Sequence, residues 1–387
     1  MDFKIIKDNP LLFFLLALIT LNVYNLSSYM YIGIILLGFS NKNLKGGSRY
    51  PIGLSFALLI ATLLCMDSYY ITWGVKMLLI SYAGMMVVKR GDTIDKYRTI
   101  ILFCSYGFAL QLILSYFYNL SMGIVGGREF ISISTMSIMS ATGFAILLVP
   151  FAGIVCYYLF HIYDLKRVRL ILFLSILVLT LMANLWLEGR TYFTVLAISF
   201  TLGLLFSFRN AIGRIERGQL RKSVKYIILA VIVLTPLLAD KVINVYETSN
   251  FYERFNRGYE DISETPRTER VIFYLNHFFD SPFGGGHIKD QLQGCRAHNM
   301  FLDGLDACGI ATFIMLLAIT FFSYKVYRTF YMQTSGVDLP TRCLFFCTFV
   351  SINASFFTEP IIEGSQWLLE YYWFITCALF AYSTKRV

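Results

Sequence analysis

The chain has 387 residues, of which 57% are hydrophobic and only 15% charged, and its mean hydropathy of +0.62 excludes an ordinary soluble globule. The formal net charge of +9 does not indicate nucleic-acid binding, because Lys and Arg fall in small clusters between apolar runs. The eight cysteines mostly lie inside those runs and form neither a metal-ligand spacing with histidine nor a disulfide framework. These features predict an integral membrane protein.

Apolar runs that approach or reach the thickness of a bilayer recur along the whole chain. They lie at about 10–26, 28–40, 52–67, 69–88, 99–119, 141–163, 170–187, 191–208, 226–240, 300–323, 343–358 and 366–383. This pattern predicts an all-α polytopic membrane protein with about 12 transmembrane helices. Lys4 and Lys7 resemble the start of a signal peptide, but no small-residue cleavage site follows, so we expect the first run to remain as a span.

The positions of Lys and Arg predict the orientation. If the N-terminus is cytoplasmic, most of the 33 basic residues fall in loops on the cytoplasmic side. The main exception is one long outer loop, and long loops are translocated largely regardless of charge. We therefore expect both termini in the cytoplasm. The predicted regions are 1–239 with transmembrane helices one to nine, 240–299 as an extracytoplasmic loop with two short helices, and 300–387 with the last three transmembrane helices.

Three polar segments are expected on the outer side: 120–140, the corner 188–190 and the long loop that ends near 299. The first half of the long loop mixes aromatic residues with Arg254 and Arg257. We expect a helix there that lies on the membrane surface or covers a cavity, with both arginines as candidate substrate ligands. In the second half, Pro266 and Pro282 bracket another predicted helix.

Four charged residues of these outer segments are candidates for a phosphate site. Arg190 begins a span, and a lone arginine there also fits an anchor at the level of the lipid headgroups. Glu188, one residue away from it across a glycine, favours a binding site, because an anchor needs no counter-charge. Arg267 and Arg270 lie one turn apart and as a pair also fit a solvated helix face. Together with Arg190 they would supply the convergent positive charge that a diphosphate requires.

His298 is the candidate for proton transfer. Imidazole titrates near neutral pH and can accept a proton from a sugar hydroxyl. The alternatives are a histidine that caps or anchors the following helix, and a zinc site with His287 and Asp290. The spacing of those residues matches no standard zinc pattern. We therefore predict a site that needs neither metal nor cofactor.

Two acidic stripes flank the predicted outer edge. Asn299, Asp303 and Asp306 share one face of the helix that re-enters the membrane. A second stripe with the same period lies near the last outer corner and comprises Glu359, Glu363, Gln366 and Glu370. These side chains fit either sugar-binding and arginine-binding groups or the polar faces of interfacial helices. The glycine run 284–286 lacks the strand and the Lys of a nucleotide-binding loop, so we expect it to allow a close backbone approach.

The order of these motifs resembles the O-antigen ligase/polymerase superfamily of bacterial envelope glycan assembly. The matching elements are Arg190 in a short outer corner, Arg267 with fourteen residues between it and Pro-Phe-Gly-x-Gly at 282–286, and His298-Asn299 opening a span with Gly309 behind it. The resemblance covers roughly residues 170–325 with motifs and the remainder only in the number of spans. The chain departs from it at Gly189, where relatives often have Ser or Thr, and at residues 272–273, where they often have Trp.

The resemblance implies a GT-C-type, metal-independent glycosyltransferase of the bacterial inner membrane. Its donor and acceptor would be glycans on undecaprenyl diphosphate, and a chain-length regulator protein would be a further partner. Arg190 and Arg267 would bind the diphosphate leaving group, and His298 would act on the acceptor hydroxyl. This chemistry agrees with the residues, because diphosphate is already a good leaving group and catalysis then needs charge stabilisation and positioning.

Three functions fit this pattern. The leading interpretation is an O-antigen or polysaccharide polymerase of lipopolysaccharide biosynthesis, which moves a growing glycan onto a lipid-linked repeat unit. A ligase that passes finished glycan to lipid A–core uses the same motifs, and the segment GCRAHN favours the polymerase only because it lacks the second histidine often seen in ligases. A flippase or transporter of lipid-linked sugar is expected to have two related halves with charges near the midplane, whereas only Lys76 lies inside a predicted span near the midplane.

Overall fold

We describe a computed structural model of the whole chain. It describes residues 2–22, 26–40, 49–89, 91–124, 129–160, 167–186, 190–210, 266–333 and 336–385, together with the single positions 218 and 225. About 80% of it is helical, and the helices are strongly apolar. This is compatible with the predicted class of an all-α membrane protein.

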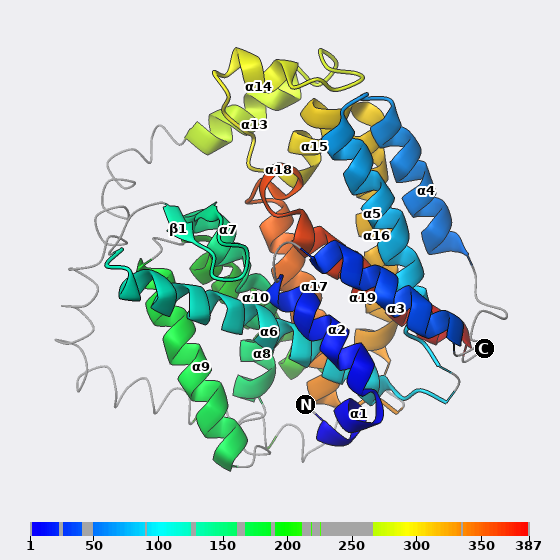
Figure 1. Cartoon of the computed structure of the whole chain (residues 1–387), viewed down its shortest axis with the longest axis vertical. Coiled ribbons are helices and arrows are strands. Elements are labelled where there is room, and N and C mark those ends of the chain that lie inside the picture. The colour runs from blue at the N-terminus through cyan, green and yellow to red at the C-terminus, as the bar shows by residue number, and fades with distance from the viewer. Residues whose placement is uncertain are drawn as a thin grey trace. The chain divides into compact units, whose positions relative to one another are not determined.

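The helices follow the apolar runs of the sequence (Figure 1). Before the long loop they are α1 (Phe3–Asp8), α2 (Pro10–Leu21), α3 (Ser27–Ser40), α4 (Tyr50–Leu63), α5 (Ser68–Met86), α6 (Ile94–Ser121), α7 (Ala141–Ile146), α8 (Val149–Phe160), α9 (Arg167–Trp186) and α10 (Arg190–Asn210). After it come α13 (Pro266–Asn276), α14 (His287–Gln291), α15 (Met300–Cys308), α16 (Ile310–Met332), α17 (Leu339–Phe356), α18 (Ile361–Gly364) and α19 (Gln366–Lys385).

Five of the described helices are long and apolar enough to cross a bilayer. They are α6, α9, α10 from Thr191, α16 and α17. Four further apolar helices, within α2, α3, α4 and the α7–α8 segment, are shorter. The predicted span at 226–240 and the predicted surface helix around Arg254 lie outside the described residues. These apolar helices support the predicted transmembrane character, and the number of twelve spans stays a prediction.

The structure differs from the sequence expectation at the run 300–323. This run is not one helix but two, because Gly309 ends α15 with φ +87°, a conformation that residues with a Cβ rarely adopt. In the polar segment 120–140, for which no element was predicted, β1 (Glu129–Ile131) and β2 (Ile138–Ser140) form an antiparallel hairpin. The hairpin is fastened to α6 by Asn119, whose side chain both donates to the Ile131 carbonyl and accepts from the Ile131 N–H.

The chain forms two compact units. The first comprises 1–103, 264–329 and 353–387, and the second comprises 104–263 and 330–352. In the first unit α5 packs against α19, α4 and α3. Its contact with α19 is close, since a Cβ at Gly84 would lie 2.6 Å from the Phe374 carbonyl oxygen. Trp373 is fully buried, and its indole N–H donates to Ser55 Oγ at 2.8 Å.

The second unit is organised around α8 and α10, which pack against each other. A Cβ at Gly153 of α8 would lie 3.0 Å from the backbone of Thr348, so this glycine allows close packing with α17. Arg342 at the start of α17 is buried, and its guanidinium donates to the Tyr331 carbonyl and to Asn210 Oδ1 at 2.9 Å each. These bonds satisfy a charged side chain where water cannot reach it.

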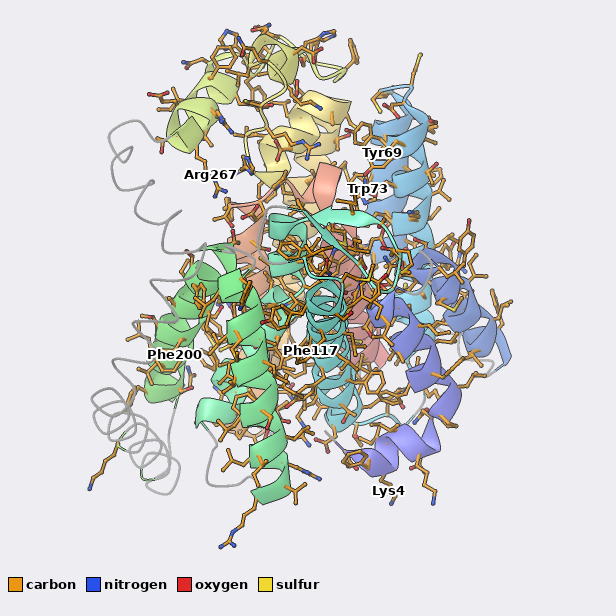
Figure 2. The ribbon with its side chains drawn as sticks, turned by 60° about the vertical axis from the view of Figure 1, so that its left-hand side comes forward. Lys4, Tyr69, Trp73, Phe117, Phe200 and Arg267 are labelled. Carbon is orange, nitrogen blue, oxygen red and sulfur yellow. The ribbon has the colours of Figure 1, made fainter. Side chains whose placement is uncertain are left out.

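Within the first unit, the N-terminal helix and the segment α13–α15 lie at opposite ends. Figures 1 and 2 agree on this: α1 with Lys4 is at one end and α13 with Arg267 at the other. This is the arrangement expected if Lys4 faces the cytoplasm and the 266–309 segment lies outside. The polar residues of the candidate site therefore gather at one end of the first unit.

Candidate functional site

Helices α13, α14 and α15 form a small cap with its own apolar core. Its fully buried members are Tyr274, Ile288, Ala297, Leu302 and Leu305. The C-terminal half of α13 contributes Tyr274 to this core. Arg267 and Arg270 lie in the first two turns of α13, where Arg267 is exposed and Arg270 partly exposed. The Tyr274 hydroxyl donates to the Cys295 carbonyl at 3.2 Å and so ties α13 to the segment that leads to His298.

The glycine run joins this cap to the end of α15. Gly284 and Gly309 both have positive φ. A Cβ on Gly284 would overlap the backbone of Ala307, and a Cβ on Gly309 would overlap the backbone of Pro282. Backbone hydrogen bonds connect the same two segments, from Gly286 N to the Asp306 carbonyl at 2.9 Å and from Ile310 N to the Pro282 carbonyl at 3.1 Å. Within the predicted run 284–286, a Cβ would overlap neighbouring backbone at Gly284, whereas nothing lies within 4 Å of a Cβ on Gly286.

Asp306 fixes the start of α14. Its carboxylate accepts from Ile288 N at 2.9 Å and from Lys289 N at 3.1 Å, and its side chain is almost fully buried. These amides belong to the first turn of α14, which has no capping side chain of its own. The carboxylate of Asp306, on α15, therefore accepts hydrogen bonds from N–H groups at the start of α14 that have no partner within their own helix.

His298 lies in a strained loop position directly before α15. Its φ is +55°, a left-handed conformation that is uncommon for a residue with a Cβ. Asp303, which is buried, holds the backbone on both sides of it by accepting from Ala297 N at 3.0 Å and from Asn299 N at 3.1 Å. Asn299 caps α15 by accepting from Phe301 N and Leu302 N. The backbone on both sides of His298 is thus held by Asp303 and by the cap of α15.

Glu359 faces His298 from the segment between α17 and α18. His298 Nδ1 lies 4.0 Å from Glu359 Oε2, and the glutamate side chain is fully buried while 26% of the histidine side chain is exposed. The next residue back, Thr358, accepts from Arg267 Nη1 through its carbonyl oxygen at 3.4 Å. Arg267 and His298 therefore meet at the same two-residue corner, although 31 positions separate them along the chain.

The imidazole of His298 is neutral at physiological pH. Burial, and then the nearby charges of Arg267, Arg270 and Arg296, lower its pKa from 6.5 to about 4. A separation of 4.0 Å is too long for a hydrogen bond, so Glu359 does not form an ion pair with it in this state. A neutral histidine among cations, with a buried carboxyl group behind it, can act as a base on a hydroxyl group.

The charges of three arginines act on one imidazole. Arg267 and Arg270 come from α13, and Arg296 comes from the loop ahead of α15. Arg267 is exposed, and Figure 2 shows it at the first turn of its helix. Guanidinium groups whose charges act on the same partly exposed side chain are suited to a phosphate or diphosphate group, which they bind through paired hydrogen bonds.

Part of the predicted site lies within the first unit. The charges of Arg267 and Arg270 act on His298, and Asp303 holds the backbone at Asn299 beside it. Arg190 is the first residue of α10, in the second unit. Glu188, Arg254 and Arg257 lie outside the described residues. The substrate-binding roles expected for Asn299, Asp303 and Asp306 stay predictions, and the bonds that these side chains make are to the protein backbone.

The other histidines of the cap are accounted for locally. His277 Nδ1 lies 2.9 Å from the Phe273 carbonyl, and its ring stacks on Phe273 with centroids 4.0 Å apart. His287 opens α14, and its Nε2 would meet a Cβ on Gly285 at 3.0 Å. Among the residues that the structure describes, no three His, Cys, Asp or Glu side chains are placed to hold a metal ion. The zinc alternative at His287, Asp290 and His298 therefore finds no support.

Two residues of this arrangement were not identified from the sequence. Arg296 stands two residues before His298, and that proximity in the chain was the available signal. Glu359 appeared only as a member of an acidic stripe, and no local pattern links it to a histidine 61 positions earlier. Comparison of the chain with known protein families gives no match, and comparison with curated proteins gives none.

Proposed function

We propose that the chain is a bacterial polysaccharide polymerase of the GT-C type, with twelve spans, in the inner membrane. It would transfer a growing glycan from undecaprenyl diphosphate onto the free hydroxyl of a lipid-linked repeat unit at the outer face. The observation that supports this most is that the charges of Arg267, Arg270 and Arg296 act on the half-buried His298, which lies 4.0 Å from Glu359 at one end of an apolar helical unit. Such a site can hold an anionic leaving group beside a base.

We assign the following roles to these groups. Arg267 and Arg270, together with Arg190, would bind the diphosphate and offset the charge that develops as the bond to the sugar breaks. His298 would accept the proton of the attacking hydroxyl through Nε2, since Nδ1 is directed toward Glu359. Glu359 would then stabilise the imidazolium, as a carboxylate does for a catalytic histidine in other transferases and hydrolases. The reaction needs no cofactor and no chain-length regulator for a single transfer.

The test uses the lipid-linked glycan that accumulates in cells lacking the gene. This extract is incubated with the purified full-length protein in lipid nanodiscs, and the products are separated by mass. We expect single repeats in the extract and their conversion to dimers and longer chains with release of undecaprenyl diphosphate. Long chains already present in the extract, which the protein passes to lipid A–core, would instead identify a ligase. Glycan moved across a liposome membrane without any new glycosidic bond would identify a transporter.

Single-residue variants test which side chains the transfer reaction needs. Arg190→Ala, Arg267→Ala and His298→Ala should each abolish the formation of new glycosidic bonds in this assay without reducing the amount of protein in the membrane. Arg270→Ala should be milder, because Arg267 alone reaches the corner at Thr358. Lys289→Ala is the matched control, since it removes a cation from the same cap that does not act on the pKa of His298. Wild-type glycan length in His298→Ala would exclude the proposed base.

A further inference from the structure

A cavity of about 230 Å³ opens in the first unit between the α1–α2 junction, the C-terminal part of α3 and the end of α5. Figures 1 and 2 place α1 at the end of this unit opposite α13, so the cavity is separate from the site at His298. A Cβ on Gly38 would overlap Met86, so this glycine keeps α3 close to α5 here. The walls of the cavity are apolar and mostly buried, and consist of Leu12, Ile34, Leu37, Met86 and Val87.

The polar lining of the cavity contains one ammonium and one carboxylate group. They belong to Lys89, which is partly exposed, and to Asp8, which is exposed. Lys89 Nζ donates to a neutral partner, Asn9 Oδ1, at 3.3 Å. Within the part of the chain that the structure describes, no ion pair involves Lys89 or Asp8, and the nearby Asp92 is paired with Lys96 at 2.8 Å. Two opposite charges at one cavity are therefore available to a ligand.

The size and the surroundings of the cavity indicate a ligand that lies partly in the bilayer. Pockets that enclose a whole small molecule usually measure about 300–1,000 Å³, so this cavity holds only part of a larger ligand. The helices α2 and α3, which line it, also carry large apolar side chains that are more than half exposed, namely Leu11, Phe14, Leu36 and Phe39. In a helical membrane protein such side chains face acyl chains. An amphiphile therefore fits both the charges and the walls.

We propose that this cavity binds one phospholipid whose headgroup carries a primary ammonium group, phosphatidylethanolamine. The Lys89 ammonium contacts the lipid phosphate, and the Asp8 carboxylate accepts from the lipid ammonium. Part of one acyl chain lies against the apolar walls, and the rest of the lipid remains in the bilayer. A purely anionic headgroup offers Asp8 no counter-charge, so the zwitterionic lipid is preferred. This inference requires only that the first unit lies in a membrane, and it uses neither the proposed reaction nor the proposed orientation.

The experiment measures lipid binding to the purified full-length protein by native mass spectrometry. The protein is delipidated in detergent and titrated with phosphatidylethanolamine, phosphatidylglycerol or phosphatidylcholine that carry the same acyl chains. We expect the first phosphatidylethanolamine to bind with a Kd about 2-fold to 5-fold lower than that of phosphatidylglycerol, which is the difference that one partly exposed charge pair supplies. Phosphatidylcholine should also bind less tightly, because its ammonium group has no N–H to donate to a carboxylate.

Variants assign this preference to the cavity. Asp8→Asn should abolish the preference for phosphatidylethanolamine without weakening the binding of phosphatidylglycerol, whereas Lys89→Gln should weaken the binding of both. Leu37→Trp fills the cavity and should prevent the first lipid from binding, while circular dichroism verifies that the helices are retained. Lys7→Gln is the matched control, because Lys7 is an exposed cation of α1 that does not line the cavity. It should bind all three lipids as the wild type does.

Three results would overturn the inference. The first is equal affinity of the wild type for the three lipids, and the second is a preference that persists in Asp8→Asn. The third is binding of soluble phosphoethanolamine as tight as that of the lipid, because the apolar walls would then contribute nothing. None of these results depends on whether the protein forms glycosidic bonds, so failure of this inference and failure of the proposed function are distinguishable.

Discussion

His298 and Glu359 face each other across 4.0 Å, the histidine at the surface of the cap and the glutamate fully buried behind it. A buried carboxyl group is costly unless its surroundings stabilise it. Its position on the Nδ1 side of the ring leaves Nε2 for a substrate. The pair therefore resembles the base and orienting acid of a catalytic dyad in geometry, although the two residues come from segments on either side of α16 and α17.

The first prediction concerns this pair. Glu359→Gln keeps the shape of the side chain but removes the charge that would stabilise an imidazolium, so we expect glycan transfer to slow about 10-fold to 100-fold. The acid limb of the pH–rate profile should move to lower pH, because the imidazolium is less favoured without its counter-charge. Asp290→Asn, which changes an exposed carboxylate on the same cap, should leave rate and profile unchanged. Unaltered transfer by Glu359→Gln would remove the glutamate from the mechanism.

The second prediction concerns the charge on His298. With a pKa of about 4 in the fold against 6.5 when unfolded, the unfolded chain binds more protons between those values. The contribution of His298 to the free energy of unfolding is therefore complete above pH 6.5 and is lost as the pH falls through about 4. NMR titration of labelled imidazoles should give that low pKa. Arg267→Ala should raise the pKa, while Lys289→Ala should not. A wild-type pKa near 6.5 would contradict the packing described here.

The third prediction separates the two costs of replacing a glycine. Gly309→Ala adds a Cβ both at positive φ and against the Pro282 carbonyl, and we expect it to destabilise the protein by about 2 kcal/mol or more. Gly286→Ala is the matched control, because its φ is +77° but nothing lies within 4 Å of the added Cβ. It should cost only about 1 kcal/mol. Thermal unfolding in detergent measures both, and equal losses would mean that the contact at Pro282 is not close.

The fourth prediction tests how Asp306 acts. If its carboxylate chiefly holds Ile288 N and Lys289 N, Asp306→Asn should lower the free energy of unfolding by about 1–3 kcal/mol. The Michaelis constant for the acceptor should then stay close to that of the wild type. A stable variant whose acceptor binding is weakened would instead support the role as a sugar ligand. Asp290→Asn, on the exposed side of α14, should change stability by no more than about 0.5 kcal/mol.

The amino-acid sequence by itself determined the class of the protein and the position of its helices. Runs of apolar residues predict helices because a bilayer leaves no other way to satisfy the backbone, and the described helices coincide with those runs. The sequence also located the polar segment that carries Arg267 and His298, and the proline that starts α13. Local rules sufficed here because both hydrophobicity and capping act over one or two turns of chain.

Only the tertiary structure decided which side chains meet. The sequence put Asp303 and Asp306 on one helix face, but only the fold directs them to the backbone at Asn299 and Ile288. It also places His298 opposite Glu359 across a long stretch of chain. Such pairings follow from the packing of whole helices, and no residue spacing encodes them. The physical reason is that contact energies act through space within a few ångströms, whereas sequence patterns report only neighbours along the chain.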